Sequence, residues 1–350
     1  MRKKFSTLFL AAMFSVLFCL PAVAAEKVYE LAFTSIYTDR HDIVQKVYKP
    51  WIEEVKTLSG GRLAITYYNP NTLCPDIELL DSLIKGQVQV GSHLTARNPG
   101  RLPLNTVLYG VALRFPTSRS ATATYLDLLK EYPALLDEFK GIKVLWVHAS
   151  APTQLHTRNT AITKLEELAS VKLLCPTNES MRMVRALGAN AIMQPNIDMY
   201  LSLSRNMAEG VLQPIAPMRS FKLDEATKYH SLVGLMVGPL WGGMNQEAYD
   251  SLPADLRKII DDTTKDMSMK LADTLYEADS RDMQWMIDKG HIYNTVPKEE
   301  LARWRPIVDK ANREHFMQQM ENRDARGINL NNLYEDALKF AEKNIDLYEK

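Results

Sequence analysis

Histidines and cysteines are the side chains of this 350-residue chain that could hold a metal ion or act as nucleophiles. Metal centres need several such ligands at short, characteristic spacings. No spacing of that kind occurs among the seven histidines, which are His41, His93, His148, His156, His230, His291 and His315. Cys74 and Cys175, the cysteines beyond the N-terminal segment, are far apart in the sequence. The sequence therefore predicts neither a metal centre nor a cofactor.

Motifs of the common enzyme classes are also missing. The chain has no Gly-x-Gly-x-x-Gly turn, no phosphate-binding Gly-Lys-Ser/Thr loop, no Gly-x-Ser-x-Gly turn and no His-Glu-x-x-His helix. A catalytic site built from distant residues leaves no local motif, because a triad is defined by geometry and not by spacing. An enzyme is therefore kept as the main alternative to a binding protein that performs no reaction.

The first 25 residues have the pattern of a secretory signal peptide. Three basic residues precede the apolar run 5–20, and small residues follow it at 22–25. The apolar run is shorter than the roughly 20 residues that a membrane-spanning helix needs. We expect residues 1–25 to be removed on export and the mature protein to reside in the periplasm.

Composition and length indicate a two-lobed protein. The chain has 42 basic and 42 acidic residues, so no nucleic-acid partner is expected. The mature length exceeds that of one ordinary hydrophobic core, which favours two lobes and a cleft between them. The expected division is a first α/β lobe at 26–150, a second at 151–240, and a crossing strand with bracing helices at 241–350. Because Cys74 and Cys175 fall in different lobes, we expect them not to pair.

Apolar spacing predicts the order of the elements. In the first lobe, strands at 28–34, 63–67 and 88–90 alternate with helices at 42–58 and 76–85, which is a βαβαβ unit with a parallel sheet. Pro50 should kink or break the first helix. A helix at 121–136 then leads to a strand at 142–147. Strands at 172–174, 191–193 and 211–213, separated by short helices, form a second α/β unit. From residue 253 onward the pattern is almost wholly helical.

Several strings in this order resemble the solute-binding proteins of TRAP transporters, the DctP family. The resembling strings are Ser-Gly-Gly-Arg-Leu at 59–63, Tyr-Asn-Pro-Asn-Thr-Leu at 68–73, Lys-Gly-Gln-Val at 85–88, Ala-Leu-Gly-Ala at 186–189, Tyr-Leu-Ser-Leu at 200–203 and Glu-Gly at 209–210. The resemblance covers nearly all of the mature chain. It implies a periplasmic-binding-protein-like α/β fold, with two lobes around a ligand cleft and long C-terminal helices. It also implies capture of a small organic solute for a TRAP-type membrane permease. A sensor on the same fold is a further alternative.

The sequence departs from the family pattern at the arginines that bind the carboxylate of an organic acid. Family members that bind organic acids have an arginine in the strand that here contains Leu174, and some have a second arginine where Gln154 stands. A neutral side chain cannot offset the cost of desolvating a carboxylate. The ligand is therefore expected to be an amine, an amino alcohol, or an aromatic or neutral polar solute. The alternative is an organic acid held by a relocated arginine, Arg158 or Arg182.

The resemblance also implies which residues line the cleft. The expected ligand-binding residues are Thr34, Tyr37, Asp76, Ser92, His93, Trp146, His148, Gln154, Leu174, Asn196, Tyr200, Gln213 and Trp241. Trp146 and Trp241 could stack on a ligand or belong to the core, and His93 and His148 could contact a ligand or be structural. Asp76 could pair with an amine or serve only as a helix cap.

Overall fold

Two β-sheets organise the chain, and the computed structural model describes residues 27–349. The predicted signal segment, 1–25, lies outside the described residues. Sheet A has the strand order β2-β1-β3-β10-β4 and sheet B the order β11-β9-β5-β8-β6-β7. The strands are β1 (Tyr29–Ser35), β2 (Leu63–Tyr68), β3 (Val90–Leu94), β4 (Ile142–Ala149), β5 (Gln154–Thr157), β6 (Lys172–Cys175), β7 (Asn190–Met193), β8 (Gly210–Gln213), β9 (Tyr229–Leu232), β10 (Pro239–Asn245) and β11 (Ile292–Thr295).

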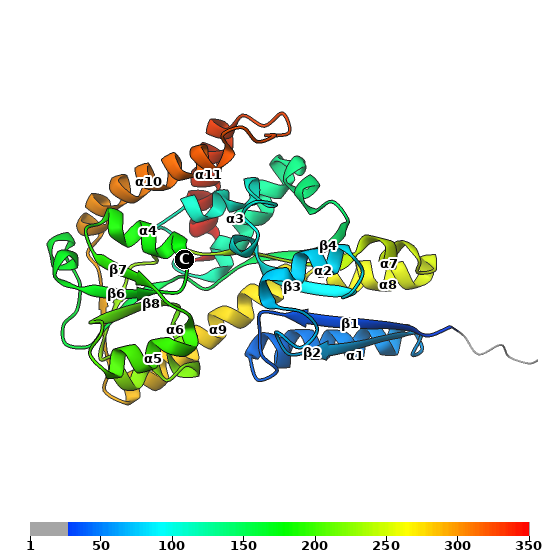
Figure 1. Ribbon diagram of the computed structural model, residues 1–350, viewed down its shortest axis with the longest axis horizontal. Coiled ribbons are helices and arrows are strands. Elements are labelled where there is room, and N and C mark those ends of the chain that lie inside the picture. The colour runs from blue at the N-terminus through cyan, green and yellow to red at the C-terminus, as the bar shows by residue number, and fades with distance from the viewer. Residues whose placement is uncertain (1–26, 350) are drawn as a thin grey trace, which may run out of the picture.

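Helices surround both sheets. They are α1 (Lys49–Leu58), α2 (Leu79–Ile84), α3 (Ser118–Glu131), α4 (Asn178–Ala186), α5 (Asn196–Ser204), α6 (Ile215–Ser220), α7 (Gln246–Asp250), α8 (Ala254–Thr264), α9 (Met267–Asp288), α10 (Lys298–Met320) and α11 (Leu330–Tyr348). In Figure 1, sheet A lies in the right half of the view, sheet B lies in the left half, and α9 (yellow) extends from one toward the other. We call the parts built on sheets A and B lobe I and lobe II.

The predicted βαβαβ unit is confirmed in lobe I. Strand β1 pairs in parallel with both β2 and β3. The predicted helix 42–58 is divided, because a π-helical turn at Val44–Tyr48 precedes α1. Pro50 occupies the first turn of α1, where its missing N–H costs no helical hydrogen bond. The proline therefore follows the change of helix type and does not break α1.

Lobe II contains a mixed sheet whose two faces bury separate apolar clusters. Leu173 and Cys175 point to a cluster that includes Met183 of α4, and Leu174 points to one that includes Met199 of α5. This alternation along β6 is the period-two pattern of a strand buried on both faces. Cys74 belongs to lobe I, and both described cysteines are free, as expected.

The C-terminal third joins the lobes. Helix α9 packs against α3, β4 and α6, and α10 packs against α4. The exception to the helical expectation is β11, which pairs in parallel with β9 of sheet B. Within residues 27–349, no helix has both the length and the apolar character needed to span a bilayer.

Candidate functional site

The carboxyl ends of the parallel strands in sheets A and B face each other. Residues 150–153 carry the chain from the end of β4 to the start of β5, and residues 233–238 carry it back from the end of β9 to β10. The two crossings hydrogen-bond to each other, since the Ser150 N–H donates to the Gly238 carbonyl oxygen at 2.8 Å. Ligand sites of open α/β folds lie at the carboxyl ends of strands. These two facing edges are therefore the candidate site.

On lobe I, Asp76 and His93 form a direct polar pair. His93 Nε2 lies 2.7 Å from Asp76 Oδ1, and Arg97 Nε lies 3.5 Å from Oδ2. Because His93 Nδ1 accepts the backbone N–H of Leu94 at 2.7 Å, Nε2 is the nitrogen that donates to Asp76. Burial raises the pKa of Asp76, but His93 and Arg97 outweigh burial and hold that pKa below its ordinary value. A cationic solute would have to compete with His93 for this carboxylate.

A second group at the edge of lobe I is aromatic and titratable. His148, near the end of β4, is fully buried, and neither ring nitrogen has a hydrogen-bond partner among the described residues. Burial, reinforced by nearby His41, lowers the pKa of His148 to about 3. His41 stacks on Tyr37 with ring centroids 4.3 Å apart, and burial lowers the pKa of His41 to about 4. Sequence reasoning missed His41 because it lies in a loop with no spacing pattern.

Two other predicted residues of lobe I have internal partners. The Tyr48 hydroxyl donates to Ser92 Oγ at 3.1 Å, and Thr34 Oγ1 donates to the Tyr68 carbonyl oxygen at 3.0 Å. Both Thr34 and Ser92 are buried. The first contact joins the π-helical turn to β3 and the second joins β1 to β2, so each side chain has a structural role whether or not it also meets a ligand.

Both predicted tryptophans lie in the core of lobe I. Trp146 packs edge-on against Trp51 with ring centroids 5.6 Å apart, and the ring centroids of Trp241 and Phe139 are 6.0 Å apart. Trp146 is 2% exposed and Trp241 is fully buried. Both tryptophans therefore belong to the core, which was one of the two alternatives for them. Contact of either ring with a ligand stays a prediction.

On lobe II, Gln154 joins the two crossings. Its Oε1 accepts the backbone N–H groups of Val233 at 2.7 Å and Gly234 at 2.9 Å. An arginine has no acceptor and could not make these two bonds. Gln154 therefore joins the two crossings through hydrogen bonds that an arginine at this position could not accept.

Gln213 and Asn196 form a pair of neutral amides at the same edge. Gln213 ends β8 and is 2% exposed, and Asn196 begins α5. Gln213 Nε2 donates to Asn196 Oδ1 at 2.7 Å. The structure thus brings together two predicted contacts that are 17 residues apart in the chain.

Leu174 stands at the expected anchor position and is buried in an apolar cluster. It is 2% exposed and packs with side chains of α5, α6 and β8, including Met199, Val211 and Ile215. Tyr200 lies at the margin of this cluster, and its hydroxyl donates to Glu225 Oε2 at 3.1 Å, which raises the pKa of Tyr200.

The two candidate replacement arginines lie in different places. Arg158 follows the end of β5, whose last residue, Thr157, pairs with Gly210 at the start of β8. That is the opposite edge of sheet B from Gln154, and the Arg158 guanidinium there contacts the Leu203 carbonyl oxygen. Arg158 is therefore not at the facing edges.

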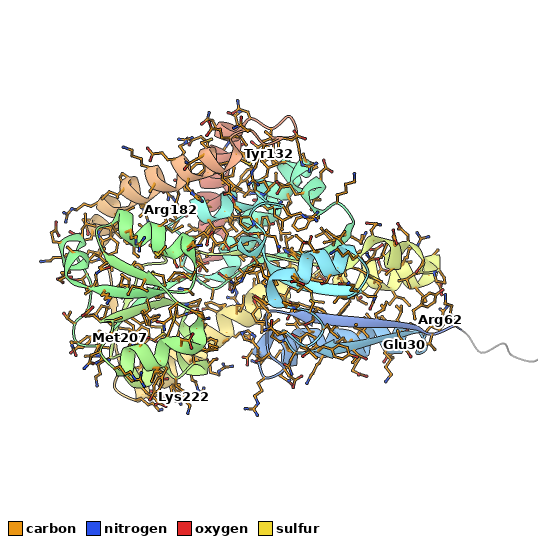
Figure 2. The ribbon with its side chains drawn as sticks, in the orientation of Figure 1. Glu30, Arg62, Tyr132, Arg182, Met207 and Lys222 are labelled. Atoms are coloured by element: carbon orange, nitrogen blue, oxygen red, sulfur yellow. The ribbon has the colours of Figure 1, made fainter. Side chains whose placement is uncertain are left out.

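Arg182 lies on α4, the helix that begins just after the carboxyl end of β6. Figure 2 shows it beside α10, where Nη2 donates to Asn312 Oδ1 at 3.3 Å. Its Nε is buried and has no hydrogen-bond partner within residues 27–349, and burial lowers the pKa of Arg182. A small cavity of about 20 Å³ adjoins it, lined by Thr106, Tyr109, Gly110, Glu179, Arg182, Asn312, His315, Phe316 and Gln319. Each of the two arginines buries an Nε that has no hydrogen-bond partner among the described residues, and of the two only Arg182 adjoins this cavity.

A larger cavity of about 320 Å³ lies away from the facing edges. It opens between α1 and the α8–α9 pair, and its lining residues are Lys46, Val47, Pro50, Trp51, Glu54, Thr263, Met267, Lys270, Asp273 and Thr274. None of the predicted site residues lines it.

The fold and the facing edges identify the class of protein. Residues 33–319 match the model of the bacterial extracellular solute-binding proteins, family 7 (DctP). The chain belongs to this family, whose members bind small solutes and work with TRAP membrane permeases. The resemblance seen in the sequence is thereby confirmed.

Solved structures of TRAP solute-binding proteins share the fold. A Desulfovibrio salexigens protein is 21% identical, with a TM-score of 0.81 over 92% of this chain and 97% of its own. A Rhodoferax ferrireducens protein in complex with benzoate is 23% identical, with a TM-score of 0.79 and coverage of 91% and 99%. A marine metagenome protein specific for aromatic acids, in complex with 3-hydroxybenzoate, is 25% identical, with a TM-score of 0.77 and the same coverage.

Proposed function

We propose that this protein captures a small organic solute between the facing edges, in the periplasm, and delivers it to a TRAP-type permease. We further propose that the solute is an amine, an amino alcohol, or an aromatic or neutral polar molecule. The observation that carries this proposal is the burial of Leu174 in an apolar cluster at the expected anchor position. A carboxylate placed there would lose its hydration and gain no ionic partner.

The amides on the edge of lobe II support a neutral or cationic ligand. Gln154 directs its carbonyl oxygen to two backbone N–H groups, and Gln213 and Asn196 offer amides without charge. Neutral amides and hydroxyls that converge in a water-excluded site orient a polar ligand well. On lobe I, the carboxylate of Asp76, which pairs with His93 and Arg97, is the group that could meet an amine.

A reaction is disfavoured by the state of the one thiol in lobe II. Cys175 is buried at the end of β6, and burial raises the pKa of its thiol to about 12. Nucleophilic cysteines are thiolates at neutral pH. Cys175 therefore supports packing and not covalent chemistry.

The test is a thermal-shift series on the mature protein with ligands matched in shape and differing in charge. Benzoate, benzamide and benzylamine form one such set, and organic acids, amino acids, amino alcohols and polyamines extend it. A ligand that binds only the folded state raises Tm. We expect increases with neutral or cationic members only. An increase with a carboxylate and not with its amide would overturn the proposed ligand class.

One observation favours a second candidate, an organic acid held by Arg182. The Arg182 guanidinium, whose Nε is buried without a partner among the described residues, could donate two hydrogen bonds to a carboxylate. If so, Arg182→Gln should abolish the Tm increase that a carboxylate causes, whereas Arg185→Gln, one turn along the same helix, should retain it. Equal responses of the two variants would exclude this candidate.

A further inference from the structure

Three histidines of lobe II form a continuous chain of ring-to-ring hydrogen bonds. His156 lies on β5, His230 on β9, and His291 directly precedes β11. His156 Nδ1 is 2.7 Å from His230 Nδ1, and His230 Nε2 is 2.8 Å from His291 Nδ1. At the other end, His156 Nε2 is 2.9 Å from the backbone oxygen of Gln213. The geometry follows from strand register, because His156 and His230 are partners in the β5–β9 ladder.

The carbonyl end of this chain fixes the tautomer of every ring. A carbonyl oxygen can only accept, so His156 must carry its proton on Nε2 and accept at Nδ1. His230 must then donate from Nδ1 and accept at Nε2, and His291 must donate from Nδ1. The donors therefore all point in one direction, from His291 toward Gln213.

The two inner rings are isolated from water. His156 and His230 are fully buried, whereas His291 is partly exposed. Burial lowers the pKa of His156 to about 4 and that of His230 to about 2. Both inner rings are consequently neutral at pH 7.

The outer ring has charged neighbours of both signs. Burial lowers the pKa of His291, Asp224 opposes this effect, and Lys228 and Lys289 add to it. The ring of Tyr293, a residue of β11, stacks on the ring of His230 with centroids 4.5 Å apart. Protons can therefore enter the chain at His291.

We infer that these three histidines are positioning residues for the solute site. Through its Nε2 proton, His156 holds the carbonyl oxygen of Gln213 at the end of β8, and the Gln213 amide holds Asn196 at the start of α5. The inference rests on the proposed function, in which Gln213 and Asn196 contact the solute. The chain thus links the surface of lobe II to the ligand-binding edge.

Proton counting gives the chain a distinctive property. One extra proton added at His291 can be passed inward with one N–H at every junction, so all hydrogen bonds survive. A second extra proton would place two N–H groups against each other. The three hydrogen-bonded histidines of the folded protein therefore accept at most one extra proton in total. The same three histidines in the unfolded protein accept three, with pKa values of about 6.5.

The first experiment uses the unaltered protein without any solute. Nitrogen-15 NMR of the histidine rings at pH 7 should show Nε2–H for His156 and Nδ1–H for His230 and His291. Acidification toward pH 4.5 should show a single protonation that begins at His291. An Nε2–H tautomer of His230, or separate protonation of two inner rings in the folded protein, would overturn the inference.

A matched pair of variants tests the positioning itself. In His156→Gln the side-chain amide overlays Nε2 and keeps a donor to Gln213, whereas in His156→Asn it overlays Nδ1 and reaches only His230. The readout is hydrogen exchange of the Gln213 side-chain amide. We expect His156→Gln to resemble the wild type and His156→Asn to lose at least tenfold in protection, which corresponds to about 1.4 kcal/mol, the worth of one buried hydrogen bond.

Equal protection of Gln213 in the two variants would refute the positioning role. If His156→Asn does not fold, His291→Leu against His291→Asn provides the same comparison at the exposed end, where only the asparagine keeps the donor to His230. Because neither measurement includes a solute, failure of this inference is distinguishable from failure of the proposed ligand class.

Discussion

The two facing edges of this protein differ in chemistry. The edge of lobe I gathers titratable side chains, with the Asp76–His93 pair and the buried, unpartnered His148. The edge of lobe II presents amides, Gln154 and Gln213, around a position that is apolar at Leu174. The titratable groups are thus on lobe I, whereas position 174 of β6 in lobe II is apolar.

The largest expected effect comes from placing charge on the neutral edge. Leu174→Arg buries a guanidinium among Met199, Val211 and Ile215 without a partner, so we expect a loss of about 4 kcal/mol in the free energy of unfolding. Leu174→Met, the control, should cost less than about 1.5 kcal/mol. Urea unfolding measures both.

Full stability of Leu174→Arg would contradict this expectation. It would mean that the guanidinium reaches the water at the facing edge, and the position would then be available to a carboxylate. Leu174→Arg should not bind the native solute more tightly if that solute lacks a carboxylate. Tighter binding would contradict the proposed ligand class.

An intermediate effect is expected at the crossing between the edges. Gln154→Leu leaves the backbone N–H groups of Val233 and Gly234 without their acceptor, so we expect a loss of about 3 kcal/mol. Gln154→Glu retains an acceptor oxygen and should lose less than half as much. Thermal unfolding at pH 7.5 checks both, and equal losses would show that the amide carbonyl is not what joins the crossings.

The smallest effect is a pH dependence that belongs to lobe I. The folded-state pKa of His148, about 3, is below the unfolded value of about 6.5, so the unfolded chain binds more protons between these values. The contribution of neutral His148 is complete above pH 6.5 and is lost as pH falls. His148→Phe should therefore gain about 2 kcal/mol relative to wild type on going from pH 8 to pH 5.

At pH 8 His148→Phe should have nearly the same free energy of unfolding as the wild type, because the ring nitrogens of His148 have no hydrogen-bond partners among the described residues to lose. The measurement is the difference in urea midpoint between the two pH values, converted with the unfolding slope. A parallel pH response of the variant and wild type would show that His148 is hydrated in the folded protein.

Local pattern sufficed for much of lobe I and failed where pairing is distant. The strand at 63–67 was predictable from the alternation of Leu63, Ile65 and Tyr67, and the strand at 142–147 from its run of apolar residues. Strand β11 was not, because four residues between two long helices acquire their strand character only from the β9 edge that they meet. The third strand begins at Val90 and not at 88, since the backbone of Val88 is used by the turn after α2.

The sequence by itself determined the family, the two α/β lobes and the apolar residue at position 174, because these depend on residue type and order. Only the tertiary structure decided what Gln154, His148 and Arg182 do. Their roles depend on partners at the crossings, under β4 and on α10 that lie far away in the chain. The histidine chain shows the same limit, since His156, His230 and His291 have no spacing in common and meet only because β5, β9 and β11 are neighbours in one sheet.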